Sequence, residues 1–100
     1  MGYSQCQKVL AIMCNNRNSQ WWFATDFQKS SLPRDLYVGY EASARMSDLF
    51  RMSPALFDKG KQGKYRVLKV RFEEVDKLYP NLPDELKVVL RDCKIINRLF

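Results

Sequence analysis

The stretch LFDKGKQGKYRVLKVRF, from Leu56 to Phe72, constrains the local structure of this chain more than any other. Leu56 and Phe57 begin one predicted strand, and residues 65–72 form the returning strand. Between them, the glycines of GKQG supply the positive φ angles that a tight turn requires. The stretch therefore predicts a β-hairpin.

Charge on this hairpin is strongly one-sided, because its 17 residues include six Lys or Arg and a single acid. Side chains alternate between the two faces of a strand. The returning strand therefore presents two mixed faces, one made by Arg66, Leu68, Val70 and Phe72 and the other by Tyr65, Val67, Lys69 and Arg71. Its distal half, residues 61–66, is polar and projects, while the proximal half supplies apolar anchors. The pattern indicates a basic, wing-shaped element.

A longer helix is expected just before the hairpin, over Tyr40 to Met52. The segment YEASARMSDLFRM has no Gly or Pro and ends before Ser53-Pro54, where proline disfavours continuation. Helical spacing separates a buried face from an exposed one. The buried face holds Ala42, Met46, Leu49 and Phe50, and the exposed face holds Tyr40, Ala44, Ser47, Asp48 and Arg51. Arg45 lies at the border between the two.

The N-terminal quarter predicts a first helix that begins with a capping box of Ser4 and Gln7. An apolar stripe of Cys6, Val9, Leu10, Met13 and Cys14 follows at helical spacing and ends at Asn15-Asn16. Next, the aromatic run 21–23 fits a short buried strand, with both tryptophans in the core.

A second capping-box spacing, Thr25 with Gln28, predicts a short second helix that ends near Lys29. The segment SSLPRDLYVG that follows has the composition of a loop. It links the second helix to the longer one.

A length of 100 residues suits one domain, and 46% hydrophobic residues are enough to form a core. The formal net charge of +6 is unevenly placed. Residues 1–72 hold 12 Lys or Arg against 5 Asp or Glu, while residues 73–100 hold 5 against 6. This asymmetry favours a surface that attracts a polyanion, although a basic face that serves only solubility has the same composition.

Two of these segments together resemble the winged helix-turn-helix family. ASARMSDL, Ala42 to Leu49, is similar to the A-R-[IM]-S-[DE]-L segment in recognition helices of small winged proteins from phages and other mobile elements. The G-x-x-G-x-Y-R hairpin follows at the corresponding distance, and the resemblance covers roughly residues 4–72. The link between the second and third helices is longer than a tight helix-turn-helix turn. The expected fold is α+β, with a three-helix core, a β-hairpin wing and extra C-terminal helices.

The resemblance implies that the helix over 40–52 enters the major groove of double-stranded DNA, where exposed side chains meet base edges. Arg51, Ser43 and Ser47 would read bases, and Tyr40 would lie on the same DNA-binding surface. The hairpin would contact phosphates, which position a protein without reading sequence. Those contacts are expected from Lys59, Lys61, Lys64 and Arg66. Asp48 and Glu41 would repel phosphate unless they accept from cytosine or pair within the protein.

Other classes find little support in the sequence. It has no histidine, no phosphate-binding glycine loop and no nucleophile beside a base, so we expect no catalysis and no cofactor. Cys6, Cys14 and Cys93 lack metal-site spacing and are expected to be buried thiols. No apolar run is long enough to span a membrane, and no signal segment is evident, so a cytoplasmic location is expected.

The C-terminal extension, residues 73–100, is expected to form a short helix from Glu73 to Tyr79 and a longer one from Pro83 to the end. Leu86, Val89, Leu90, Cys93, Ile96 and Phe100 make one apolar stripe on the longer helix. Three more apolar residues lie off that stripe, and they suggest a homodimer interface: Val88, Ile95 and Leu99. The alternative is that this helix only packs across the core of the domain formed by residues 1–72, or borders a larger protein.

The sequence thus favours a DNA-binding transcriptional or replication accessory factor of a phage or mobile element. The alternative is a protein-interaction module, such as a phage-encoded inhibitor, whose basic winged surface docks an acidic protein.

Overall fold

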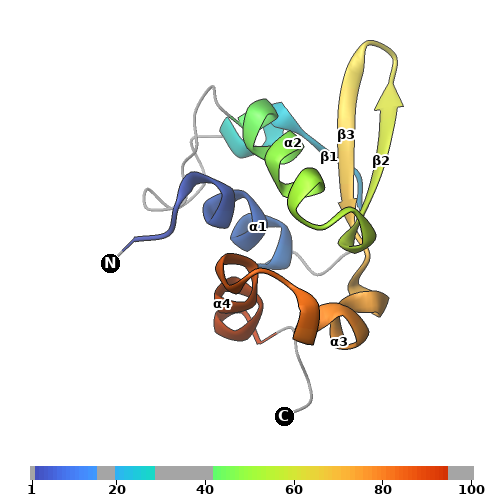
Figure 1. Cartoon of the computed structure of the whole chain (residues 1–100). Coiled ribbons are helices and arrows are strands. Elements are labelled where there is room, and N and C mark those ends of the chain that lie inside the picture. Colours follow the sequence, from blue (N-terminus) through green and yellow to red (C-terminus); the bar gives the residue numbers. More distant parts are fainter. Residues whose placement is uncertain (1, 16–19, 29–41, 95–100) are drawn as a thin grey trace.

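Helix α1, Gln5–Asn15, begins at the predicted capping box. Gln7 Oε1 accepts a hydrogen bond from the Ser4 backbone N–H at 2.8 Å, and Ser4 Oγ accepts one from the Gln7 N–H at 3.2 Å. The computed structural model describes residues 2–15, 20–28 and 42–94 (Figure 1). Within these ranges the start and the end of the first helix are as predicted.

Helix α1 is the centre of the core rather than a one-sided surface helix. Beyond the predicted stripe, Ala11 and Ile12 are also buried. The reason is that α1 lies between two other helices, α2 (Ala42–Met52) on one side and α4 (Asp84–Asp92) on the other (Figure 1). A helix covered on two sides buries more of its circumference than a single stripe.

Three strands form one antiparallel sheet in the order β1-β3-β2. Their bounds are Trp22–Phe23 for β1, Phe57–Gln62 for β2 and Tyr65–Val70 for β3. β3 is central, pairing Leu68 with Trp22 on one side and with Lys59 on the other. The hairpin and the short aromatic strand predicted from sequence are both confirmed.

The hairpin turn lies closer to the return strand than GKQG suggested. Gln62 pairs with Tyr65, so the turn contains only Gly63 and Lys64. Gly63 has φ of +62°, which costs glycine nothing. Gly60 instead belongs to β2 and pairs with Val67. A two-residue turn that begins with glycine matches the twist of its strands, and it extends the paired ladder to the tip.

The expected second helix is a 3₁₀ helix, Ala24–Gln28. Thr25 does not cap it, because the helix starts one residue earlier; instead, Asp26 Oδ2 accepts a hydrogen bond from the Phe23 N–H at 2.8 Å. Phe27 is fully buried and stacks on Trp22 with ring centroids 5.3 Å apart. The turn thus anchors β1 to the core. Lys29 and the loop expected after it lie outside the described residues.

Helix α2 ends at Met52, as predicted, and a 3₁₀ turn, Pro54–Leu56, leads directly into β2. Its core face is formed by Ala42, Met46 and Leu49, which are buried, whereas Phe50 is only partly buried. This short connection places the hairpin beside the helix. Tyr40 lies outside the described residues.

The chain leaves the sheet through short helical turns that pack beneath it: Phe72–Glu74, α3 (Val75–Leu78) and Tyr79–Asn81. In α4, Leu86, Val89 and Leu90 are fully buried and join the same core cluster as α1 and the sheet. Tyr3 Oη donates a hydrogen bond to Asp92 Oδ2 at 2.6 Å. This hydrogen bond fixes the N-terminal segment against helix α4.

Helix α4 ends at Asp92, where the sequence predicted a continuous helix to Phe100. Lys94 has φ of +55°, a left-handed conformation that does not continue a right-handed helix. Val88 is partly exposed and lies off the buried stripe, while Ile95 and Leu99 lie outside the described residues. Homodimerisation through these three residues stays a prediction.

The architecture is thus a small α+β fold, as expected at the level of class: an antiparallel three-stranded sheet packs with helices before, between and after its strands. Among the residues that the structure describes, no helix has the length and apolar character needed to cross a membrane.

Candidate nucleic-acid interface

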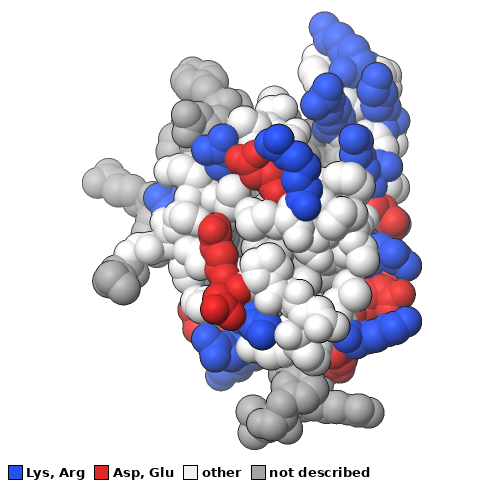
Figure 2. Space-filling view, viewed as in Figure 1, with Lys and Arg blue, Asp and Glu red and all other residues white. Residues whose placement is uncertain are grey.

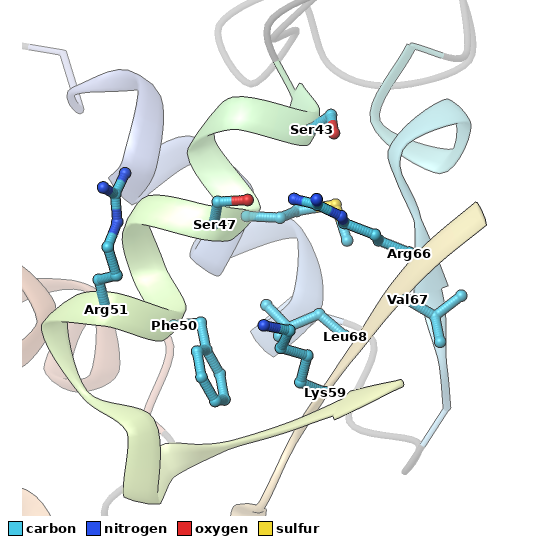
Figure 3. A pocket seen from close by; sticks show the side chains of 9 residues that line it. Ser43, Ser47, Phe50, Arg51, Lys59, Arg66, Val67 and Leu68 are labelled. Atoms are coloured by element: carbon cyan, nitrogen blue, oxygen red, sulfur yellow. The ribbon is translucent and has the colours of Figure 1, made fainter. Parts of the chain in front are cut away.

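A groove of about 390 Å³ runs between helix α2 and the hairpin. Ser43, Ser47, Phe50 and Arg51 line it from α2, and Lys59 and Arg66 line it from β2 and β3 (Figure 3). Of the eight DNA-binding residues predicted from sequence, five line this groove and two, Lys61 and Lys64, lie at the hairpin tip above it. Tyr40 lies outside the described residues. We refer to the groove below as the α2–hairpin groove.

Strand register explains why the basic residues of the hairpin face helix α2. Lys59 pairs with Leu68, and Lys61 pairs with Arg66, and directly opposed residues point to the same face of a sheet. Because Leu68 is buried in the core beneath α2, the cations farther along that face extend past the core, alongside the helix. The mixed face predicted for β3 therefore joins the core at Leu68 and Val70 and becomes a basic surface at Arg66.

Lys59, on the wall of the groove, contacts an aromatic ring of its floor. Its Nζ lies 5.2 Å from the centroid of the Phe50 ring. Such a cation–π contact is worth roughly 0.5–1 kcal/mol at an exposed site and positions the ammonium without neutralising it. Phe50 was assigned to the buried face on helical spacing alone. It lies at the edge of that face, and its position beside a basic strand was not visible in the local sequence.

Arg66 crosses the groove from β3 toward α2. Figure 3 shows its guanidinium directed at the helix face that carries Ser43 and Ser47. Ser43 is exposed and Ser47 is partly exposed. Small hydroxyl side chains leave the helix surface open to a close neighbour and can donate or accept hydrogen bonds.

Arg51 differs from the other predicted site residues. Its guanidinium points away from the groove in Figure 3, and Arg51 Nη2 donates a hydrogen bond to Asp48 Oδ1. The side chain is nevertheless 75% exposed. Asp48 also attracts a second cation, since Arg45 Nε lies 3.1 Å from Asp48 Oδ2 without hydrogen-bond geometry. Asp48 was expected either to accept a hydrogen bond from cytosine or to pair within the protein. The structure shows the pairing within the protein.

The four residues predicted to contact phosphate differ from Arg51 in having no acidic partner among the described residues. Within the described ranges, no acid forms an ion pair with Lys59, Lys61, Lys64 or Arg66; the hairpin's acid, Asp58, instead lies 4.0 Å from Arg71. Lys64, at the turn, places its Nζ 5.5 Å from the Tyr65 ring centroid. Figure 2 shows the blue side chains gathered over the hairpin at the upper right, with no red atoms among those nearest its tip. The hairpin therefore presents uncompensated positive charge beside α2.

The two groups with shifted pKa values, Cys6 and Tyr3, do not line this groove. Burial raises the pKa of the Cys6 thiol, and the nearby charges of Asp48 and Glu85 raise it further. Burial and the hydrogen bond to Asp92 raise the pKa of Tyr3. Both groups therefore stay protonated at neutral pH. All three cysteines lie in the described ranges and none forms a disulfide. In the same ranges, no cluster of three or more potential metal ligands is found.

Comparison of the chain with protein-family models, with curated proteins and with solved structures finds no match. The arguments about function therefore rest on the residues and their geometry.

Proposed function

We propose that this protein binds double-stranded DNA with helix α2 and the hairpin, in the manner of a winged helix-turn-helix protein. The observation that carries the proposal is the α2–hairpin groove, which is lined by Lys59 and Arg66 on one side and by the accessible Ser43 and Ser47 of a helix on the other, and where no acid among the described residues forms an ion pair with these cations. Uncompensated cations beside a protruding helix fit a double helix, whose backbone presents regularly spaced phosphates.

Support for the winged-helix assignment comes from the order of the elements. Helix, short strand, 3₁₀ turn, helix and hairpin follow one another, and the first strand pairs with the second strand of the hairpin. In this assignment α2 is the recognition helix and the hairpin is the wing. The loop that would complete the helix-turn-helix, residues 29–41, lies outside the described part of the chain.

The division of labour follows from side-chain chemistry. Lys59, Lys61, Lys64 and Arg66 would contact phosphates and release counterions, which gives affinity that falls with salt. Ser43 and Ser47 would face base edges, where a hydroxyl can take either hydrogen-bonding role. Because serine is small, α2 can approach the floor of a major groove closely. Sequence-specific binding of this kind suits a transcriptional or replication accessory factor, as the sequence suggested.

One observation favours the alternative of an acidic protein partner. The floor of the groove is apolar, with Met46, Phe50 and Leu68 beneath its basic walls. An amphipathic acidic segment would bury its apolar side chains there and place its carboxylates against Lys59 and Arg66. DNA remains the better fit, because the basic surface extends from the groove to the hairpin tip, well beyond the apolar floor.

The deciding experiment is an electrophoretic shift of a random-sequence duplex, followed over a range of salt concentrations. Binding at low salt with log affinity falling linearly against log salt supports DNA binding. No shift, with polyglutamate or an acidic peptide bound at the same salt, would favour the protein partner. Selection of bound sites from a random duplex pool then tests whether α2 reads sequence.

A further inference from the structure

Two large hydrophobic side chains are exposed in the described part of the chain, and both lie on the sheet. Trp21 is 36% exposed and Tyr65 is 55% exposed. Trp21 was expected in the core together with Trp22, yet only Trp22 is buried. An exposed indole contributes little to the core and needs another explanation.

Both rings belong to the face of the sheet that points away from helix α2. Tyr65, Val67 and Lys69 alternate with the residues that face α2, and Phe23 pairs directly with Val67. Phe23 and Tyr65 form an edge-to-face contact with centroids 6.3 Å apart. Trp21 precedes the inward-facing Trp22 and therefore turns outward. We call this surface the outer sheet face.

Gly60 makes room for the indole on this face. A Cβ atom at Gly60 would lie 3.4 Å from Cζ3 and Cη2 of Trp21 and 3.4 Å from Val67. The indole therefore packs across the β2–β3 ladder, over backbone that a larger residue would cover. Beside Tyr65, at the edge of this face, the surface is hollowed, with a volume of about 240 Å³ that is lined by Phe23, Thr25, Lys64 and Arg66 and, from helix α2, by Ser43. The two rings are thus rigidly supported, and space remains next to one of them.

Each exposed ring carries a lysine. Lys69 Nζ lies 4.8 Å from the Trp21 ring centroid, and Lys64 Nζ lies 5.5 Å from that of Tyr65. Among the described strand residues one acid shares this face, Asp58, which pairs with Lys69 in register and lies 4.0 Å from Arg71. The face therefore combines flat aromatic surfaces with a net positive charge.

We propose that the outer sheet face binds single-stranded nucleic acid. Unpaired bases stack on Trp21 and Tyr65, and the phosphates between them are bound by Lys64 and Lys69. A duplex cannot use these rings, because its base faces are already stacked on one another, whereas single strands offer a π-face at every base. Along a single strand, negative phosphates and flat bases follow one another. This order matches the lysines and aromatic rings that lie beside one another on this face.

Lys64 and Lys69 have a favourable contact both without and with bound nucleic acid. Without a ligand, each ammonium rests over a ring, which gives it a weak cation–π contact. A stacking base displaces it, and its flexible four-carbon stem lets it move to the neighbouring phosphate. The two rings lie on the opposite face of the sheet from the α2–hairpin groove, while Lys64, at the turn between the faces, belongs to both proposed surfaces, and the hollow beside Tyr65 shares Ser43 and Arg66 with the groove. The single-strand proposal does not rest on the duplex-binding proposal.

Intrinsic tryptophan fluorescence tests the proposal with an oligothymidylate of about 15 nucleotides, a length in the range that single-strand sites cover. Saturable quenching is expected, since Trp21 is the exposed indole. Tyr65→Leu and Lys69→Gln should each weaken oligothymidylate binding, the former by roughly 5- to 100-fold. Lys77→Gln, which makes the same charge change on α3, should leave it unchanged. Circular dichroism and thermal unfolding establish that each variant is folded.

Four results would overturn the proposal. They are no saturable quenching by oligothymidylate, full affinity in folded Tyr65→Leu and Lys69→Gln variants, polyglutamate binding as tight as oligothymidylate, and concentration-dependent self-association that Tyr65→Leu abolishes in the absence of nucleic acid. The last would make this face a contact between copies. If Trp21→Leu does not fold, the Tyr65 and Lys69 variants still decide the question. Duplex affinity measured on the same variants separates this site from the groove, because Tyr65→Leu should leave it intact.

Discussion

Helix α2 and the hairpin both carry cations, but among the described residues it is the hairpin that leaves several of them without an acidic partner. On α2, Arg45 and Arg51 share the carboxylate of Asp48. On the hairpin, Lys59 and Arg66 reach the groove with no acidic partner in the described ranges. A phosphate must compete with Asp48 for the first pair, whereas for the second pair it competes with no carboxylate in the described ranges, and the contact of Lys59 with the Phe50 ring does not neutralise the ammonium. Binding energy is therefore expected to depend on which cations are available rather than on how many there are.

The largest expected effect comes from removing the hairpin charges. Changing Lys59, Lys61 and Arg66 together to Gln should reduce the slope of log affinity against log salt by about 2–3 and weaken duplex binding roughly a hundredfold near 0.1 M salt. The loss should be similar for all duplex sequences, because phosphate contacts carry no sequence information. Salt titrations by fluorescence anisotropy measure both quantities.

A matched variant makes the same charge change elsewhere. Lys77, Lys87 and Arg91 changed to Gln lie on α3 and α4, away from the groove. Only a small, general loss is expected from the lower net charge. Equal salt slopes for the two triple variants would show that the hairpin binds no phosphate.

The second prediction breaks the element that presents these cations. Gly63→Ala forces a side chain into a turn position with φ of +62°, which should lower the free energy of unfolding by about 1 kcal/mol or more. Gly2→Ala is the control, since nothing lies within 4 Å of a Cβ there and its φ is not positive. Urea unfolding compares the two. Unchanged stability in Gly63→Ala would mean that the turn is built differently from the one described.

Much of this fold could be predicted from local sequence. The capping box at Ser4, the helix ending at Met52 and the hairpin all depend on residues within a few positions of one another, where spacing and turn chemistry act directly. The errors arose where tertiary packing decides. The burial of Ala11 and Ile12 reflects two neighbouring helices, and the position of the Trp21 indole across the sheet depends on the absent side chain of Gly60, on a strand nearly 40 residues away.

The site was predictable in part for the same reason. Alternation along β3 showed that Arg66 shares a face with Leu68, and that placement is observed. The cation–π contact of Lys59 with Phe50 could not be predicted, because it joins a helix to a strand. The pairing of Asp48 with Arg45 and Arg51 had a signal, the three-residue spacing on each side, which is the spacing of neighbours on a helix. Composition counted those arginines as available charge.

The third prediction concerns a substitution that frees the two arginines of α2 from their shared carboxylate. Asp48→Asn removes the shared carboxylate and frees Arg45 and Arg51, so duplex binding should tighten by roughly fivefold and the salt slope should steepen by about 1. Asp76→Asn, at an exposed position on α3, makes the same charge change far from the groove and should have little effect. Weaker binding by Asp48→Asn would show instead that this carboxylate accepts from a base or holds α2 in its binding geometry.

The smallest effect is expected from Arg51, and it sharpens the comparison most. Since its guanidinium is bound to Asp48 and points away from the groove, Arg51→Ala in the otherwise unchanged protein should weaken duplex binding less than about threefold, the range of an exposed ion pair. In the Asp48→Asn background the same substitution should cost more, because there the guanidinium is free to reach DNA. The double-mutant cycle measures the difference as a coupling free energy between residues 48 and 51. A loss of about 1–3 kcal/mol on a preferred site, with little change on random duplex, would contradict this expectation. It would mean that Arg51 leaves Asp48 on binding and reads a base, the role its position on the helix first suggested.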